Sequence, residues 1–390
     1  MLDSRDWWAA WEARSSRTPT GWPRDARISQ REYGNRTYRE RVKARDGELR
    51  GATAARGSGV LRGVPVWAWR LLMRLMSRSE RARFNAEPIA GVDYHDDIDF
   101  VGDGIRAHRL DVIVPRRTTD DQHDNDTGLL PVYVYFHGGG WTSGDKAALT
   151  KYCASQAVAG MIVVNVNYRM ATRFQMKHML EDANAALAWV GNTIASFGGD
   201  PDRIVLGGDS AGGQIAAMIT AASFRPELAQ HYGLTPSTPR GRFRGLVQHC
   251  SAVDFSVHFD RGFILSLNFI RMLLPRTLVA SATAAGAADA AGTGRHHLLR
   301  LASRFLSPIE WLDVGFPPVF VTTSERDYFY RANLNFVATL RRNSIPVETL
   351  IYDRTRVNAQ HTWQQNYRYP ESQEVYRRLQ GFVRRVATLS

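Results

Sequence analysis

Apolar runs of strand length recur along the chain from residue 92 onward. Alternation with a period of two predicts an edge hairpin, with residues 92–100 and 107–114 as its strands and Gly102-Asp103-Gly104 as its turn. Continuous apolar runs predict buried strands over 130–136, 161–166, 203–206, 245–250, 317–323 and 345–352. Helical patterns lie between and after these strands, over 214–219, 263–278 and 371–388. Alternating strands and helices are typical of an α/β protein.

A further helix is predicted ahead of the sheet, over Val64–Arg78. Three arginines, at 70, 74 and 78, recur every four residues and share one face. The opposite face is apolar and consists of Trp67, Leu71, Leu72, Leu75 and Met76. Such a helix either lies on an anionic membrane or packs over an active site or the core, and its short span favours packing. We expect a basic, Trp-rich extension with cap helices over 1–87 and a catalytic domain over 88–390.

The formal net charge of +12 is unevenly distributed, because residues 1–85 hold 19 Lys and Arg against 9 Asp and Glu. This surplus suits nucleic acid, an acidic membrane surface or an acidic substrate. No nucleic-acid motif accompanies it, so a solvated, arginine-rich extension is the simpler interpretation and no nucleic-acid partner is expected.

Location and covalent chemistry follow from what the sequence lacks. The first fifteen residues carry charges and no apolar core of a signal peptide, and no apolar run is long enough to span a membrane. Cys153 and Cys250 are too few for a disulfide framework or a metal site. A cytoplasmic protein without metal or cofactor is expected, while peripheral membrane contact and the oligomeric state stay open.

The stretch Gly208-Asp209-Ser210-Ala211-Gly212 stands between a predicted strand and a predicted helix. It fits the G-x-S-x-G nucleophile elbow, in which a tight turn lifts the serine hydroxyl clear of the sheet. The glycines are required because the turn leaves no room for side chains two positions on either side of the serine. Ser210 is therefore the candidate nucleophile.

A second glycine-rich motif, His137-Gly138-Gly139-Gly140-Trp141, follows the strand 130–136 directly. Consecutive glycines let backbone N–H groups approach the oxygen of a tetrahedral acyl intermediate. We expect the N–H groups of Gly138, Gly139 and Ala211 to form this oxyanion hole. His137 is expected to tie the loop to its neighbours by hydrogen bonds, and Trp141 either to line the pocket and bind substrate or to pack beneath the loop.

These motifs together resemble the hormone-sensitive-lipase-like family of α/β-hydrolase carboxylesterases. The resemblance covers about residues 88–390 and implies an α/β-hydrolase fold, with a mostly parallel sheet flanked by helices. Its other blocks are Asn167-Tyr168-Arg169-Met170-Ala171, Glu181-Asp182-Ala183 and Phe197-Gly198-Gly199-Asp200-Pro201-Asp202-Arg203. Two departures stand out: Thr172-Arg173 where the family usually has Pro-Glu, and Gln214 where it has Asn. The resemblance also places a lid segment within 255–305, and the alanine- and glycine-rich residues 280–294 predict a flexible insertion in the same range.

A serine nucleophile needs a base, and the base needs an orienting carboxylate, in the chain order Ser, Asp or Glu, His. Asp327 follows the strand 317–323 and is also the matching family position, with Glu325 as its competitor two residues away. His361 lies in the loop after the next strand, whereas His296 and His297 precede the acid. The family usually has His-Gly-Phe at this point, and this chain has His361-Thr362-Trp363.

Three functions compete on these residues. The leading hypothesis is a serine carboxylesterase that hydrolyses short- to medium-chain acyl esters through Ser210, His361 and Asp327 and an acyl-enzyme. The second is acyl transfer or lactone chemistry on a specialised metabolite by the same serine. The third is a ligand-binding protein without catalysis, which the presence of all three side chains disfavours.

Overall fold

The computed structural model describes residues 65–72, 88–116, 128–260, 263–275 and 293–388. Eight strands form one sheet in the order β1-β2-β4-β3-β5-β6-β7-β8. The strands are β1 (Val92–Asp99), β2 (Arg109–Pro115), β3 (Leu130–Phe136), β4 (Ile162–Val166), β5 (Gly199–Asp209), β6 (Phe243–His249), β7 (Val319–Ser324) and β8 (Val347–Tyr352). β2 is antiparallel to both β1 and β4, and the pairs from β4 to β8 are parallel.

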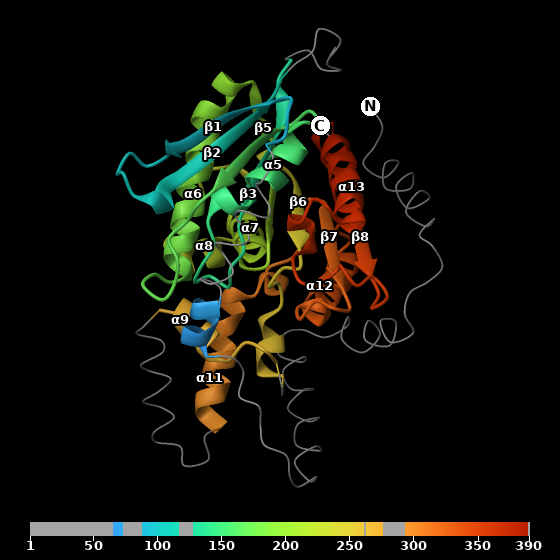
Figure 1. The fold of residues 1–390 in the computed structure, drawn as a ribbon. Helices are drawn as coiled ribbons and strands as arrows, with labels where there is room; N and C mark the ends of the chain where they lie inside the picture. The colour runs from blue at the N-terminus through green and yellow to red at the C-terminus, as the bar shows by residue number, and fades with distance from the viewer. Residues whose placement is uncertain (1–64, 73–87, 117–127, 261–262, 276–292, 389–390) are drawn as a thin grey trace.

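Helices cover both faces of this sheet (Figure 1). They are α5 (Thr150–Ala157), α6 (Met176–Thr193), α7 (Ala211–Ala222), α8 (Pro226–Tyr232), α9 (Asn268–Leu273), α11 (Thr293–Ser303), α12 (Tyr330–Arg342) and α13 (Pro370–Ala387). α6, α7 and α12 pack in the core on one face, and α5 and α13 pack in the core on the other face. Within the described residues, none of these helices is both long enough and apolar enough to cross a membrane.

Side-chain alternation along β3 shows how the sequence builds both cores. Val132, Val134 and Phe136 point into the core that contains α6 and α7. Tyr133 and Tyr135 point into the core that contains α5 and α13. Successive side chains of a strand point to opposite faces, and a strand covered on both faces is therefore apolar throughout. The predicted buried strand is confirmed.

The parallel strands bring distant segments to one edge of the sheet. The oxyanion-loop motif follows β3, Ser210 follows β5, Asp327 lies three residues after β7, and His361 lies in the loop after β8. Carboxyl ends of parallel strands meet at the same edge, which is where open α/β sheets bind their ligands.

The N-terminal helix differs from its sequence-based expectation. Residues 66–72 are helical and lie beside α9 and α11 (Figure 1). However, Trp67 and Leu71, expected on the packed face, are 71% and 53% exposed, whereas Trp69 is 8% exposed. The orientation is set by Trp69, whose ring contacts Phe269 of α9 edge-on with centroids 6.2 Å apart. The expectation that the helix packs over the active site or core is confirmed, but the face that packs is not the predicted one.

Other expectations are confirmed only in part. Of the predicted helix over 263–278, α9 is helical and residues 263–267 before it are not, while residues 276–278 lie outside the described residues. The Trp-rich residues 1–60, the end of the predicted helix over 64–78 and nearly all of the insertion 280–294 lie outside the described residues.

Candidate active site

Ser210 occupies the turn between β5 and α7. Its backbone has φ 52° and ψ −115°, a conformation that residues other than glycine rarely adopt. A Cβ atom on Gly208 would lie 2.4 Å from the Gly212 carbonyl carbon, and one on Gly212 would lie 2.0 Å from the Phe136 carbonyl oxygen. The G-x-S-x-G geometry expected from the sequence is present, and the neighbouring glycines are sterically required.

Asp209, next to the nucleophile, ties together three segments of the site. Its carboxylate accepts hydrogen bonds from the Tyr135 hydroxyl at 2.6 Å, the Gly138 N–H at 3.0 Å and the Gln365 amide at 2.9 Å. Burial raises the pKa of Asp209, and the Tyr135 hydrogen bond opposes that rise. The sequence placed Asp209 within the elbow motif but gave no role for it.

The same hydrogen bond corrects one member of the expected oxyanion hole. The Gly138 N–H is already donated to Asp209, so it does not point to a substrate oxygen. Gly139 (φ 121°) and Gly140 (φ 60°) line the cavity, and neither N–H donates to an acceptor among the described residues. The Ala211 N–H is the first of α7 and has no partner within the helix. The available donors are therefore those of Gly139, Gly140 and Ala211.

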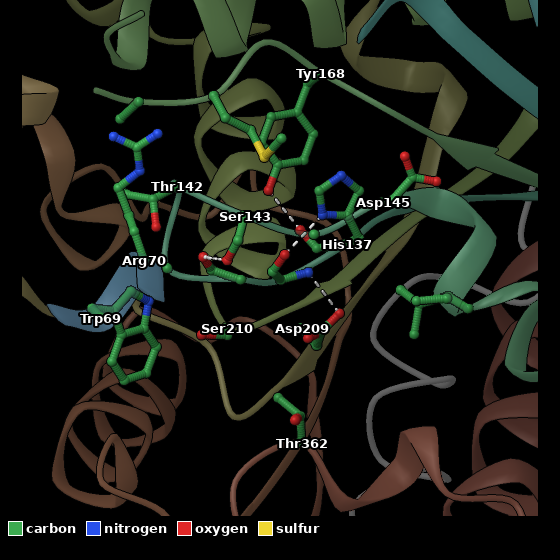
Figure 2. Close-up of a pocket in the computed structure, with 18 of the residues that line it drawn as sticks. Trp69, Arg70, His137, Thr142, Ser143, Asp145, Tyr168, Asp209, Ser210 and Thr362 are labelled. Atoms are coloured by element: carbon green, nitrogen blue, oxygen red, sulfur yellow. Dashed lines mark hydrogen bonds between the residues drawn. The ribbon is translucent and has the colours of Figure 1, made fainter. Parts of the chain in front are cut away.

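His137 fixes the oxyanion loop from behind. Its Nδ1 lies 2.8 Å from the Gly138 carbonyl oxygen, and its ring stacks on Tyr168 with centroids 4.5 Å apart. The Tyr168 hydroxyl donates to the His137 carbonyl at 2.7 Å (Figure 2). Burial lowers the pKa of His137, which keeps the imidazole neutral and its Nδ1–H available as a donor. The expectation that His137 ties the loop to its neighbours is confirmed.

Of the two positions expected for Trp141, the structure has the one beneath the loop. The indole is 1% exposed, packs against Phe255 and Phe269, and does not belong to the cavity lining. Its N–H donates to the Gln214 side-chain oxygen at 2.6 Å. This corrects the assignment of Trp141 to substrate binding and explains the departure at 214, because the longer amide reaches both the indole and the Leu306 carbonyl.

Asp327 and His361 form a direct pair. The His361 Nδ1 lies 2.7 Å from Asp327 Oδ1, and the carboxylate also accepts from the Thr323 hydroxyl at 2.8 Å and the Phe329 N–H at 3.0 Å. Glu325, the competing carboxylate, instead accepts from the Arg354 N–H at 3.1 Å. The acid that orients the imidazole is therefore Asp327.

The hydroxyl of Ser210 faces a residue that the sequence did not single out. Hydrogen bonds of the described residues include none between Ser210 and His361, while the Tyr328 side chain lies close enough to Ser210 to interact with it. The Tyr328 ring also lies against His361, with centroids 3.9 Å apart. Burial raises the pKa of Tyr328 well above its ordinary value, so the hydroxyl stays protonated. The one feature of the sequence that could have pointed to Tyr328 is its position directly after Asp327.

Cys250 also lies beside this pair. In the described part of the chain, its sulfur and ligand atoms of Asp327 and His361 lie within 4.8 Å of one another, a spacing that a metal ion could use. Burial raises the pKa of the Cys250 thiol well above its ordinary value, so the sulfur keeps its proton. A protonated thiol is a poor metal ligand, and the imidazole Nδ1 is already bound to the carboxylate.

These groups open into a cavity of about 750 Å³. Ser210, Tyr328 and His361 lie at its floor together with Gly139 and Gly140. Its other side is lined by the 66–72 helix and by the loop that follows β4 (Figure 2). The volume is that of an ordinary small-molecule pocket.

A family model for the alpha/beta hydrolase fold matches residues 133–358, more than half of the chain. The chain belongs to the α/β-hydrolase family. It is similar to the carboxylesterase NlhH of Mycobacterium tuberculosis, with 47% identity over 91 residues. That aligned stretch covers 23% of this chain and 28% of NlhH. The chain is 36% identical over 150 residues to the probable carboxylic ester hydrolase LipM of the same organism, 38% of this chain and 30% of that protein.

The expected resemblance to hormone-sensitive-lipase-like carboxylesterases is confirmed by these matches. The aligned stretches span less than a third of the length of these curated relatives. Solved α/β-hydrolase structures agree in fold over a greater length. Esterase B from Lactobacillus rhamnosis has a TM-score of 0.63 at 18% identity, covering 82% of this chain and 95% of that one. The bacterial heroin esterase has a TM-score of 0.55 at 20% identity, and the match covers 84% of this chain and 95% of that one.

Proposed function

We propose that this α/β hydrolase is a serine carboxylesterase acting on short- to medium-chain acyl esters. One observation carries the proposal: the imidazole of His361, held by Asp327 at 2.7 Å, lies in the same cavity as the strained Ser210. The cavity volume of about 750 Å³ suits a small ester. Relatives with the names carboxylesterase, lipase and esterase support the same reaction class.

In the proposed reaction Ser210 attacks the acyl carbonyl carbon. With its Nδ1–H donated to Asp327, the imidazole of His361 has its other nitrogen free to accept the serine proton. The hydroxyl first has to turn from Tyr328 to His361, a tightening that is common between unliganded and reacting sites. The imidazolium then protonates the leaving alcohol. In the second half His361 takes a proton from water, whose oxygen attacks the acyl carbon, and the bond to Ser210 breaks as the imidazolium returns the proton to the serine, which releases the acid.

Charge on the tetrahedral intermediate is stabilised by main-chain donors. Among the described residues the N–H groups of Gly139, Gly140 and Ala211 have no competing acceptor; Gly139 and Gly140 line the cavity with Ser210, and Ala211 directly follows it. Donors that are fixed before the reaction need no reorganisation as charge develops, which makes them effective. The carboxylate of Asp209 holds the preceding glycine and so fixes this loop relative to the elbow.

The test is hydrolysis of p-nitrophenyl acetate and p-nitrophenyl butyrate by the full chain. We expect Ser210→Ala to abolish the release of p-nitrophenol, and Ser196→Ala, on an exposed serine far from the cavity, to leave it unchanged. Release that persists in Ser210→Ala would refute the proposal. Slow hydrolysis with fast transfer to an added alcohol would identify an acyltransferase, and ester binding without release would identify a ligand-binding protein.

A further inference from the structure

Two guanidinium groups line the cavity without a carboxylate partner. Arg70 extends from the 66–72 helix, and Arg173 lies in the loop after β4. No ion pair of the described residues involves either side chain, and the Nε of Arg70 is buried without a hydrogen-bond partner. The contact that Arg70 does make is a long one, from its Nη1 to the Thr172 hydroxyl at 3.4 Å. Arg173 lies over the Phe174 ring, 5.4 Å from its centroid.

The other charges around the cavity are compensated by neighbours. Arg169 pairs with Asp182 at 2.6 Å and with Glu181 at 3.2 Å. Burial alone would raise the pKa of Asp145, but two hydrogen bonds from Arg106 and one from the Ala147 N–H hold it below its ordinary value. The buried Asp209 carboxylate accepts hydrogen bonds from three donors. The uncompensated charge of the lining is therefore positive and comes from the two rim arginines.

The inward position of Arg70 is fixed by its neighbour Trp69. That indole is buried against Phe269, and a Cβ atom on Gly140 would lie 2.4 Å from its Nε1, so the ring rests directly on the oxyanion loop. Its N–H is also buried without an acceptor. Figure 2 shows the Trp69 and Arg70 side chains on the cavity side that holds Thr142 and Ser210. The rim thus presents two donors that lack acceptors.

A partly buried guanidinium without a counter-ion is unfavourable until an anion binds to it. A carboxylate fits best, because its two oxygens match the fork of an arginine side chain. We propose that the cavity selects esters that also carry a carboxylate, which pairs with Arg70, while Arg173 adds to the positive potential at the rim. This substrate class rests on the proposed esterase function.

Both departures at residues 172 and 173 act in the same direction. Arg173 stands where the family usually has an acidic residue, so the charge at this point of the rim is reversed. Thr172 supplies the hydroxyl that contacts the Arg70 guanidinium. The 66–72 helix and the loop after β4 are therefore linked through the group that would bind the anion.

The test compares esters that differ in one charge. p-Nitrophenyl hydrogen adipate carries a carboxylate on the acyl side and p-nitrophenyl methyl adipate does not; 4-acetoxybenzoate and its methyl ester are the matching pair for the alcohol side. We expect kcat/KM to favour the anion in at least one pair by about tenfold, the range of a charge-assisted hydrogen bond. High salt should reduce this preference.

Variants assign the preference to the rim. Arg70→Gln should bring the anionic-to-neutral ratio of kcat/KM close to one, Arg70→Lys should retain part of the preference, and Arg173→Gln should lower it less. Arg116→Gln is the matched control, since Arg116 pairs with Asp93 away from the cavity. A preference for the neutral ester in both pairs, or an unchanged ratio in Arg70→Gln with an unchanged melting curve, would overturn the proposal.

Binding separates this proposal from the esterase function on which it rests. The Ser210→Ala variant can be titrated calorimetrically with monomethyl adipate, an anion, and with dimethyl adipate, which is neutral. Tighter binding of the anion, lost when Arg70→Gln is added, supports the carboxylate site even if no ester is hydrolysed. Equal binding of the two compounds contradicts it even if the esterase reaction is established.

Discussion

The floor and the rim of the cavity are built on opposite principles. The floor, formed by Ser210, Tyr328, His361, Gly139 and Gly140, is fixed by hydrogen bonds to buried carboxylates: Asp327 holds His361, and Asp209 holds the oxyanion loop through the Gly138 N–H. The rim, residues 66–72 and 169–174, leaves the guanidinium groups of Arg70 and Arg173 without carboxylates. A fixed floor suits a reaction whose geometry must not vary, whereas an uncompensated rim suits the choice of substrate.

The largest expected effect concerns the acid at the floor. Asp327→Asn should lower kcat/KM for p-nitrophenyl butyrate by about 10⁴-fold, because the amide no longer holds His361 in the required tautomer. Glu325→Gln is the matched control and should be nearly unchanged, since that carboxylate bonds to the Arg354 main chain. Similar losses in the two variants would mean that the acid has been misassigned.

Substitution in the oxyanion loop should lower activity nearly as much as Asp327→Asn does. In Gly139→Ala the added Cβ would lie 2.1 Å from the Ser143 carbonyl oxygen at a φ of 121°, which displaces a donor. We expect kcat to fall by about 10²- to 10³-fold, as for the loss of one oxyanion donor. Gly104→Ala, at φ 77° in open space, imposes similar backbone strain away from the site and should leave kcat unchanged. Equal kcat in the two variants would contradict the loop's role.

The protein should lose stability in acid because His258, packed behind Trp141, is buried as a neutral imidazole. His258 stacks on Phe255 behind Trp141, and burial lowers its pKa to about 3. As the pH falls, His258 takes up a proton in the unfolded chain before it does so in the folded protein. The folded state therefore has its full stability, as far as this residue is concerned, above the unfolded pKa of about 6.5, and loses stability as the pH falls toward 3. Between about pH 7 and about pH 5 this one imidazole should remove roughly 2 kcal/mol from the free energy of unfolding.

Urea unfolding at the two pH values measures this loss. His258→Phe keeps an aromatic ring in the same packing and should lessen the acid loss by that amount. An identical acid loss in His258→Phe and in the unmodified protein would show that this imidazole is not held neutral.

The smallest expected effect concerns Tyr328, at the floor of the cavity. Tyr328→Phe removes the hydroxyl near Ser210 but keeps the ring against His361. The Ser210 hydroxyl must leave Tyr328 before it attacks, and a hydroxyl contact is worth about 1 kcal/mol, so we expect acylation to be roughly fivefold faster. Tyr328→Ala, which also removes the ring, should be slower than the unmodified protein. Stopped-flow release of p-nitrophenol measures both rates, and slower acylation in Tyr328→Phe would assign the hydroxyl a direct role in the reaction.

The sequence predicted the floor in outline because its signals are local. A strand, a turn that only glycine permits and a helix define Ser210 within ten residues, and the parallel sheet then brings the segments after β7 and β8 to the same edge. The order of motifs was sufficient to select Asp327 and His361, and their contact at 2.7 Å agrees with that choice.

The details that sequence reasoning missed depend on contacts between distant segments. Three consecutive glycines do not reveal which N–H is taken by Asp209, so Gly138 was chosen where Gly140 is available. The helical pattern over 64–78 placed Arg70 opposite the apolar face that was expected to pack, yet packing of Trp69 against Phe269 turns it toward the cavity. The periodicity of a helix indicates which residues share a face, but the segment against which the helix packs determines which face is buried.

Labelling with a fluorophosphonate, followed by peptide mass analysis, tests most directly whether Ser210, His361 and Asp327 act as one unit. We predict a single adduct on the peptide that contains Ser210, and labelling at least about 10²-fold slower in His361→Ala, because the hydroxyl then lacks its base. An adduct on another residue, or equally fast labelling of Ser210 without the imidazole, would contradict this prediction.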